Sequence, residues 1–261
     1  MKIMETTGAK HIDIEAIIAI ARKAGDAIME IYAQDFEVEY KEDNSPLTQA
    51  DKKANEIIMD GLNGLTIVFP ILSEEGRHIP YEERKGWEYF WMVDPLDGTK
   101  EFIKKNGDFT VNIALIHKSV PIVGVVYAPV LNEMYWAKQG DGAFKNGDRL
   151  PLQYNQHPEK VLRVVASKSH LNTETQEYID NLAKVTDSME FISKGSSLKL
   201  CMVAQGCADI YPRLSPTMEW DTAAADAIVR EAGKMTVDIQ NNTPLLYNKE
   251  NLLNPWFVVL S

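Results

Sequence analysis

Long apolar runs and cysteines are both scarce in this sequence. No stretch approaches the roughly 20 apolar residues of a membrane-spanning helix, and residues 1–11 lack the apolar segment of a signal peptide. The two cysteines, Cys201 and Cys207, are too few for a disulfide framework and lack the spacing and partners of a zinc site. We therefore expect free thiols and a cytoplasmic protein without an integral membrane segment. A loose association with the inner face of a membrane stays open.

Basic residues are in the minority. The chain of 261 residues has 27 Lys and Arg against 38 Asp and Glu, which gives a formal net charge of -11. This charge argues against a nucleic-acid polymer or an anionic membrane surface as the main partner. It would also repel an anionic small molecule unless bound divalent cations reversed the charge locally. Repeats and low-complexity tracts are absent as well, so the length allows one large domain or two small ones.

The most informative stretch follows an apolar run, residues 89–93, which is predicted to be a buried strand. The residues after it are Asp94, Pro95, Leu96, Asp97, Gly98 and Thr99. Two carboxylates with the Leu96 carbonyl between them form a hard-oxygen ligand set that suits Mg²⁺. The free N–H groups of Gly98 and Thr99 at a glycine turn suit a phosphate. The same residues taken alone are also typical of an ordinary turn. The choice between a metal site and a turn therefore depends on residues elsewhere in the chain.

Hydrophobic spacing predicts an α/β (α+β) layered sandwich of alternating helices and sheets. Helices are predicted over residues 12–32, 50–62, 173–184, 196–205 and 222–232. Strands are predicted over residues 66–72, 89–93, 111–116, 121–128, 133–137, 161–166, 188–192, 208–211, 237–239 and 256–260, with a hairpin turn at Asn146-Gly147. The first half is predicted to be mainly an antiparallel meander. A soft boundary near residues 155–159 would divide an N-terminal α+β half, 1–155, from a C-terminal α/β half, 156–261, within one compact unit.

Three further acidic residues stand at the ends of predicted elements. Glu74 follows the strand 66–72, Asp221 opens the helix 222–232, and Asp51 lies near the start of the second helix. Each alone is compatible with a helix N-cap, a first-turn acid or a solvated loop. A two-metal site needs four or five carboxylate oxygens around ions about 3.5–4 Å apart. Glu74 and Asp221, together with the two aspartates after the strand 89–93, would supply these oxygens if the element ends converge.

Two stretches resemble the signatures of a known superfamily. Residues 91–102, W-M-V-D-P-L-D-G-T-K-E-F, resemble the first signature of the lithium-sensitive, magnesium-dependent phosphomonoesterases, which include inositol monophosphatase and fructose 1,6-bisphosphatase. Residues 220–232 resemble the second signature, and residues 73–75 match as well. The order and spacing hold over nearly the whole chain. Four segments resemble the branch of 3'(2'),5'-bisphosphate nucleotidases of the bacterial CysQ type, namely residues 100–102, 167–170, 195–199 and 211–213.

This resemblance implies the fold of the superfamily and hydrolysis of adenosine 3',5'-bisphosphate to AMP and phosphate, with its sulfated precursor as a second substrate. It implies two Mg²⁺ ions, and a third, weaker ion held near Glu74 largely through water. The implied metal ligands are Glu74, Asp94, the Leu96 carbonyl, Asp97 and Asp221. The implied water-activating pair is Asp51 and Thr99. The implied substrate contacts are Gly98, Thr99, His170, Ser196, Lys199 and Arg213.

Several alternatives stay open from the sequence. An inositol monophosphatase or related sugar phosphatase would have the same metal centre. A non-catalytic sensor of metal and nucleotide would not need the pair Asp51 and Thr99. An acidic scaffold would require three ordered motif matches by chance. Lys199 and Arg213 could instead be an exposed helix lysine and a surface turn residue. The expected partner is a small nucleotide bisphosphate, and the resemblance leaves a monomer or a homodimer open.

Overall fold

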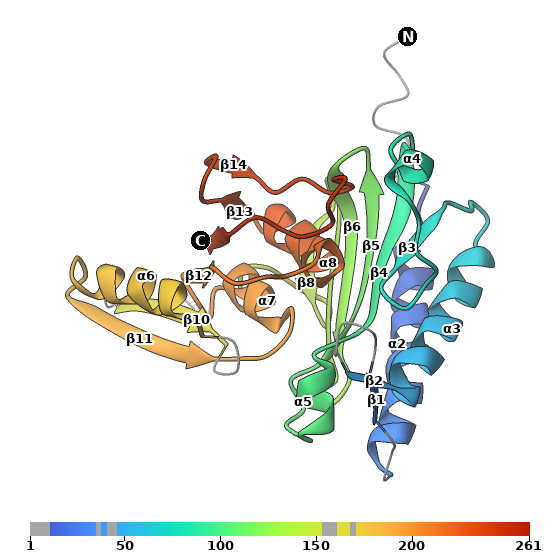
Figure 1. Cartoon of the computed structure of the whole chain (residues 1–261), viewed down its shortest axis with the longest axis horizontal. Helices are drawn as coiled ribbons and strands as arrows, with labels where there is room; N and C mark the ends of the chain where they lie inside the picture. The colour runs from blue at the N-terminus through green and yellow to red at the C-terminus, as the bar shows by residue number, and fades with distance from the viewer. Residues whose placement is uncertain (1–10, 35–37, 41–45, 153–160, 168–170) are drawn as a thin grey trace.

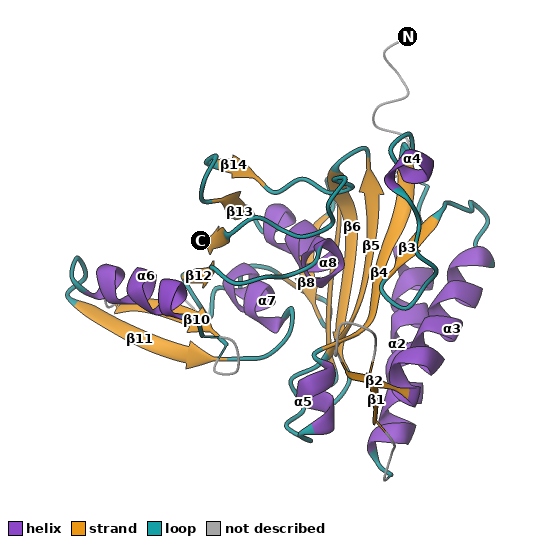
Figure 2. Cartoon of the chain, in the orientation of Figure 1, coloured by secondary structure: helices purple, strands orange, loops and turns teal. Residues whose placement is uncertain are grey.

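Helices and sheets alternate in layers in the computed structural model of the chain (Figure 1), which describes residues 11–34, 38–40, 46–152, 161–167 and 171–261. Two helices cover one face of a seven-stranded sheet, and two more helices separate that sheet from a six-stranded one. A last helix lies on the far side of the six-stranded sheet (Figure 2). The predicted layered sandwich is therefore confirmed.

The first helix layer consists of α2 (Ile14–Tyr32) and α3 (Gln49–Asn63), both close to their predicted bounds. Asp13 caps α2 by accepting hydrogen bonds from the backbone N–H groups of residues 15 and 16. A small two-stranded sheet, β1 (Val38–Tyr40) and β2 (Pro46–Thr48), leads into α3. The apolar faces of α2 and α3 bury themselves against the seven-stranded sheet, which explains their helical spacing of isoleucine and alanine.

The seven-stranded sheet is almost wholly antiparallel, as predicted. Its strands, in spatial order, are β3 (Ile71–Ser73), β4 (Tyr89–Asp97), β5 (Thr110–His117), β6 (Val120–Ala128), β7 (Glu133–Lys138), β8 (Gly142–Lys145) and β9 (Asp148–Arg149). Only β3 and β4 run parallel. Alternate residues of the central strands face opposite layers: Trp91 and Val93 pack with α2 and α3, whereas Phe90 and Met92 face the inner helices.

The structure differs from the predictions at two strand ends and at two short helices, and it confirms one predicted turn. The strand predicted over 66–72 begins only at Ile71, because the residues before it form bends and coil. The strand predicted to stop at residue 93 continues to Asp97. The short helices α4 (Tyr81–Arg84) and α5 (Thr99–Ile103) were not predicted, since one turn has no periodicity to detect. The Asn146-Gly147 turn is confirmed, with both residues at positive φ between β8 and β9.

The second half of the chain supplies the remaining layers. The inner helices are α7 (Leu198–Gln205) and α8 (Glu219–Glu231), and the outermost is α6 (Thr173–Ala183). The six-stranded sheet has the order β11 (Ser188–Ser193), β10 (Val161–Ala166), β12 (Ile210–Arg213), β15 (Phe257–Leu260), β13 (Met235–Asp238) and β14 (Thr243–Pro244). Helix α8 begins at Glu219 rather than at the predicted residue 222, so Asp221 lies in its first turn. The boundary predicted at 155–159 lies outside the described residues.

Within the described residues, no helix combines the length and the apolar character that crossing a bilayer requires.

Gly124 sets the distance between β6 and α8. A Cβ atom at this position would lie 2.1 Å from the carbonyl oxygen of Ala224 and 2.8 Å from the Cβ of Ala227. The alanines of α8 and the missing side chain at Gly124 together allow the helix to lie directly on the sheet. Because α8 carries Asp221 in its first turn, this close packing also places that carboxylate.

We expect Gly124→Ala to lower the free energy of unfolding by about 3 kcal/mol, because the added methyl group forces α8 away from the sheet. For a chain of this size, the melting temperature should fall by about 6–12 °C. Thermal unfolding followed by circular dichroism measures this change. Gly86→Ala is the matched control, since nothing lies within 4 Å of the position its Cβ would take. Equal melting temperatures for the two variants would contradict the packing argument.

Candidate active site

A bulge in β4 brings the two aspartates of the first motif to the same face of the sheet. Residues three apart on a regular strand point to opposite faces. Asp94 pairs with Asn112 of β5, and Asp97 pairs with Thr110. The two paired positions are therefore three residues apart on β4 but only two apart on β5, so β4 contains one extra residue. Pro95, which has no N–H to donate to a ladder, lies in this irregular stretch. The extra residue turns both carboxylates toward the inner helices.

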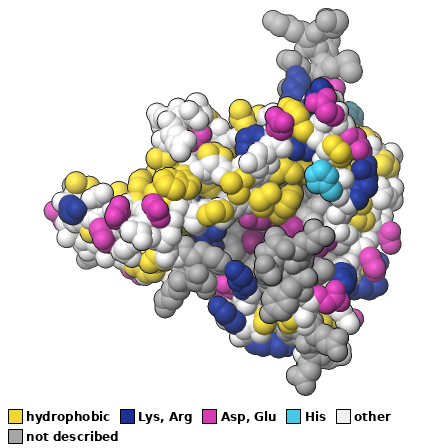
Figure 3. All heavy atoms as spheres, in the orientation of Figure 1, with side chains coloured by type: hydrophobic (Ala, Val, Ile, Leu, Met, Phe, Trp, Pro, Cys, Tyr) yellow, Lys and Arg dark blue, Asp and Glu magenta, His cyan; other side chains and the backbone are white. Residues whose placement is uncertain are grey.

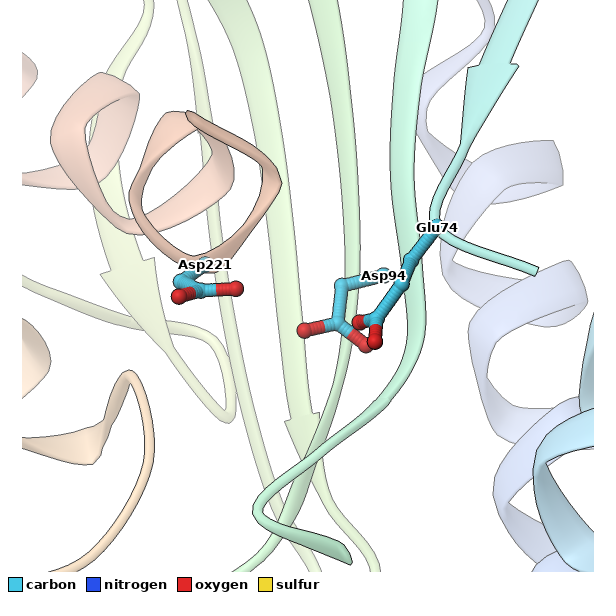
Figure 4. A group of neighbouring side chains, drawn as sticks. All are labelled: Glu74, Asp94 and Asp221. Atoms are coloured by element: carbon cyan, nitrogen blue, oxygen red, sulfur yellow. The ribbon is translucent and has the colours of Figure 1, made fainter. Parts of the chain in front are cut away.

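Glu74, Asp94 and Asp221 form an acidic group whose carboxylate oxygens lie within 4.8 Å of one another. Glu74 follows the end of β3, Asp94 lies on β4, and Asp221 comes from the first turn of α8; Figure 4 shows all three pointing into one space. Burial, and then the charge of Glu74, raises the pKa of Asp94 well above its ordinary value. Burial, and then the charge of Asp97, raises the pKa of Asp221 in the same way. Three gathered carboxylates repel one another, so a divalent cation fits this donor set.

Asp97 lies outside this acidic group. Its Oδ2 accepts hydrogen bonds from the Ser196 hydroxyl at 2.6 Å, the Ser197 N–H at 2.7 Å and the Ser197 hydroxyl at 2.9 Å. The loop before α7 therefore holds this carboxylate. Sequence reasoning had placed Ser196 only at the substrate, and it had not singled out Ser197.

Asn112 and Thr110 extend this network and were also missed. The Asn112 side-chain amide donates to the Ser197 hydroxyl at 2.8 Å, and the Thr110 hydroxyl donates to the Asn112 side-chain oxygen at 3.0 Å. Both residues are fully buried on a strand of apolar neighbours. Buried polar side chains in an apolar strand need partners, and this was the signal in the sequence that could have identified them.

Asp51 has two roles, one for each carboxylate oxygen. Oδ2 accepts from the N–H and the hydroxyl of Thr48 at 2.8 and 2.6 Å, so Asp51 closes a capping box at the start of α3. Oδ1 accepts from the Thr99 hydroxyl at 3.1 Å. The same hydroxyl lies 3.3 Å from the Leu96 carbonyl oxygen. Burial raises the pKa of Asp51 above its ordinary value, although the hydrogen bonds from Thr48 and Thr99 oppose the shift. Asp51 is therefore a first-turn acid of α3, with Thr48 as the N-cap, and it is also hydrogen-bonded to Thr99.

A cavity of about 580 Å³ opens beside the acidic group. Figure 3 shows acidic side chains in a hollow near the middle of this face. The site residues predicted from the sequence that line the cavity are Glu74, Asp97, Gly98, Thr99, Ser196, Lys199, Arg213 and Asp221. Asp94 lies beneath this lining and is 1% exposed. Gly98 has a φ of 94°, and a Cβ there would lie 3.0 Å from the Asp108 carbonyl oxygen, so glycine is needed at the turn into α5.

Three basic residues line the cavity, of which Lys100 is exposed, Arg213 is half-buried and Lys199 is buried. Lys199 is 5% exposed, its ammonium donates to the Ser196 carbonyl at 2.6 Å, and it lies over the ring of Tyr211. Burial lowers the pKa of Lys199 to about 8. Arg213 donates to the Pro216 carbonyl at 2.9 Å, and its buried Nε has no hydrogen-bond partner in the described chain. The alternative of an exposed helix lysine at 199 is therefore wrong. His170, the remaining predicted contact, lies outside the described residues.

Comparison with known proteins gives consistent results. The model of the inositol monophosphatase family matches residues 11–256. A 3'(2'),5'-bisphosphate nucleotidase CysQ from Escherichia coli O157:H7 is 48% identical over 249 residues, which cover 94% of this chain and 98% of that protein. The structure of CysQ from Bacteroides thetaiotaomicron has a TM-score of 0.86 at 47% identity and covers 97% of this chain and 98% of its own. The IMPase of Thermotoga maritima has a TM-score of 0.74 at 26% identity, with 95% and 91% covered. Since the family model spans almost the whole chain and a relative is 48% identical at nearly full length, this chain belongs to the inositol monophosphatase family.

Proposed function

We propose that this chain is a Mg²⁺-dependent phosphomonoesterase that hydrolyses adenosine 3',5'-bisphosphate to AMP and phosphate. The observation that carries the proposal is one cavity lined both by carboxylates and by two basic residues, the buried Lys199 and the half-buried Arg213. A substrate with two phosphates needs two anion sites, and guanidinium and ammonium groups bind a phosphate directly. The relatives named as 3'(2'),5'-bisphosphate nucleotidases support this substrate class. The sulfated precursor carries the same 3'-phosphate and would be dephosphorylated in the same way.

Enzymes of the inositol monophosphatase family are generally metal-dependent. We assign one Mg²⁺ to Glu74, Asp94 and the Leu96 carbonyl. We assign a second to Asp94, Asp97 and Asp221, with a third, weaker ion near Glu74 held through water. The acidic group supports the first two assignments, because the carboxylate oxygens of Glu74, Asp94 and Asp221 lie within 4.8 Å of one another and are the kind of ligand that Mg²⁺ prefers.

Bound Mg²⁺ would neutralise charge on the transferring phosphoryl group and lower the pKa of a water molecule. The N–H groups of Gly98 and Thr99 would hold the phosphate oxygens. With its proton donated to Asp51 Oδ1, the Thr99 oxygen can accept a hydrogen bond from the attacking water. As the water would attack phosphorus, its proton would pass to Thr99 and the Thr99 proton to Asp51. The bond from phosphorus to the ribose 3'-oxygen would break at the same time, and that oxygen would take a proton from solvent water. The raised pKa of Asp51 suits it to take that proton.

An inositol monophosphatase is the second candidate. The Thermotoga maritima IMPase shares the fold, and the same metal ligands would serve either substrate. The buried Lys199 and the half-buried Arg213 favour the nucleotide, because a monophosphate has no second phosphate for them to bind.

The deciding experiment compares phosphate release from adenosine 3',5'-bisphosphate and inositol 1-phosphate, with Mg²⁺ and with EDTA. We expect strong preference for the nucleotide and complete loss of release in EDTA. Preference for inositol phosphate would contradict the proposed substrate but would remain consistent with the proposed metal centre. Binding of nucleotide without any turnover would support the sensor alternative. The cytoplasmic location and the choice between monomer and homodimer stay predictions.

The KM for adenosine 3',5'-bisphosphate should rise as the pH increases above about 8. Burial lowers the pKa of Lys199 to about 8, so the ammonium loses its proton and its attraction for the 5'-phosphate above that pH. We expect KM to rise by up to about tenfold between pH 8 and pH 9, since each unit above the pKa removes tenfold of the protonated form. Steady-state kinetics with adenosine 3'-monophosphate, which lacks the second phosphate, provide the control. An equal rise for that substrate would contradict the assignment of Lys199.

A further inference from the structure

Glu101 is a buried carboxylate that the proposed mechanism does not use. It lies in the short helix α5, is 6% exposed, and lines the same cavity as the acidic group. In the part of the chain that the structure describes, its carboxylate has neither a hydrogen bond nor an ion pair. Its oxygens are open to the cavity rather than sealed in the core, so a hydrogen-bond donor that enters the cavity can reach them.

The position of Glu101 narrows the identity of that partner. Two residues before it in the same helix is Thr99, which the proposed function places at the scissile phosphate. The charge of Glu101 also acts on Lys199, which the proposed function places at the other phosphate. A Cβ at Gly195 would lie 3.1 Å from the Glu101 Cγ, so the loop that leads to the nucleotide contacts packs directly on this side chain. Glu101 therefore lies close to both proposed phosphate positions.

A carboxylate accepts hydrogen bonds and repels phosphates, so within this substrate its partner is a neutral donor close to the phosphates. In adenosine 3',5'-bisphosphate the ribose joins the two phosphates, and it has one free hydroxyl, at the 2' position. The amine of the base lies on the other side of the sugar, away from both phosphates.

We propose that Glu101 is a specificity-determining residue that accepts a hydrogen bond from the ribose 2'-hydroxyl of the substrate. This inference rests on the proposed function, because it takes the positions of both phosphates from it. The enzyme would select ribonucleotide over 2'-deoxyribonucleotide bisphosphates, since without that hydroxyl the buried carboxylate stays unpaired in the complex.

The test measures kcat/KM for adenosine 3',5'-bisphosphate and its 2'-deoxy analogue with the wild type, Glu101→Gln and Glu101→Leu. The wild type should prefer the ribonucleotide by about 10- to 100-fold, the range expected for a hydrogen bond to a charged group. Glu101→Gln keeps an acceptor oxygen and should retain part of this ratio, whereas Glu101→Leu should bring it close to one. Glu177→Leu, an exposed position on α6, should leave the ratio unchanged.

Thermal unfolding separates recognition from a folding defect. Both Glu101 variants should melt close to the temperature of the wild type, because the carboxylate faces the cavity and makes no bond to the described residues that the substitutions would break. Equal kcat/KM of the wild type for the two nucleotides, or an unchanged ratio in Glu101→Leu, would overturn the inference. A third substrate, inosine 3',5'-bisphosphate, checks the base: if Glu101→Leu removes discrimination only against inosine, the carboxylate binds the amine and the inference is wrong. Absence of turnover of every nucleotide by the wild type would instead contradict the proposed function.

Discussion

Asp94→Asn should lower kcat by about 10³-fold or more, because a metal ion supplies several kcal/mol of transition-state stabilisation and each 1.36 kcal/mol is a factor of ten. Asp94 is the one carboxylate assigned to both ions, and its oxygens lie in the acidic group with Glu74 and Asp221. Asparagine keeps the shape and can still accept the hydrogen bond that the Leu96 N–H donates to Oδ1 at 3.1 Å. Phosphate release at saturating substrate and Mg²⁺ measures the effect. Near-normal turnover by this variant would contradict the two-metal assignment.

The same substitution should stabilise the metal-free protein. Burial, followed by the charge of Glu74, raises the folded-state pKa of Asp94, so ionising it costs the fold stability. That cost is absent below the unfolded pKa of about 3.9 and grows as the pH rises toward the folded value. In EDTA at pH 7, Asp94→Asn should therefore melt at a higher temperature than the wild type, and the difference should vanish near pH 3. Asp60→Asn, an exposed aspartate of α3, is the matched control for loss of charge.

Thr99→Val should lower kcat by about 10²- to 10⁴-fold, the usual contribution of general-base catalysis, with little change in fold or in Mg²⁺ affinity. Valine has the size of threonine but neither accepts a hydrogen bond from water nor donates one to Asp51, whose Oδ1 lies 3.1 Å from the Thr99 hydroxyl. Thr99 is the better test position because Asp51 also closes the capping box of α3, so its removal would combine a catalytic and a structural effect.

Thr99→Ser is the conservative control, since it retains the hydroxyl and should recover most of the activity. A kcat for Thr99→Val within tenfold of the wild type would show that another group takes the proton. Equal losses in Thr99→Val and Thr99→Ser would show that the methyl group, and not the hydroxyl, matters.

The acidic residues show which features of the site a local sequence pattern can predict and which it cannot. Asp94 and Asp97 were recognisable because a proline and a glycine interrupt an apolar strand, and such interruptions are local. That both carboxylates point to the same face of the sheet depends on the bulge opposite Asn112 and Thr110, which appears only in the pairing of β4 with β5. Glu74 and Asp221 were recognisable as acids at element ends, yet neighbouring positions such as Glu75 carried the same local signal.

The sequence by itself determined the layered fold, the helices and strands with strong periodicity, and the residues of the acidic group. These follow from short-range patterns of hydrophobicity and turn residues, which act within a few positions of the chain. Only the tertiary structure decided that Ser197 holds Asp97, that Lys199 is buried, and that Glu101 lines the cavity with no partner among the described residues. Each of these depends on which distant segments exclude water from a side chain or reach it with a donor. The spacing of residues along the chain does not show which side chains are shielded from water. That shielding is set by the packing of α7 and α8 between the two sheets.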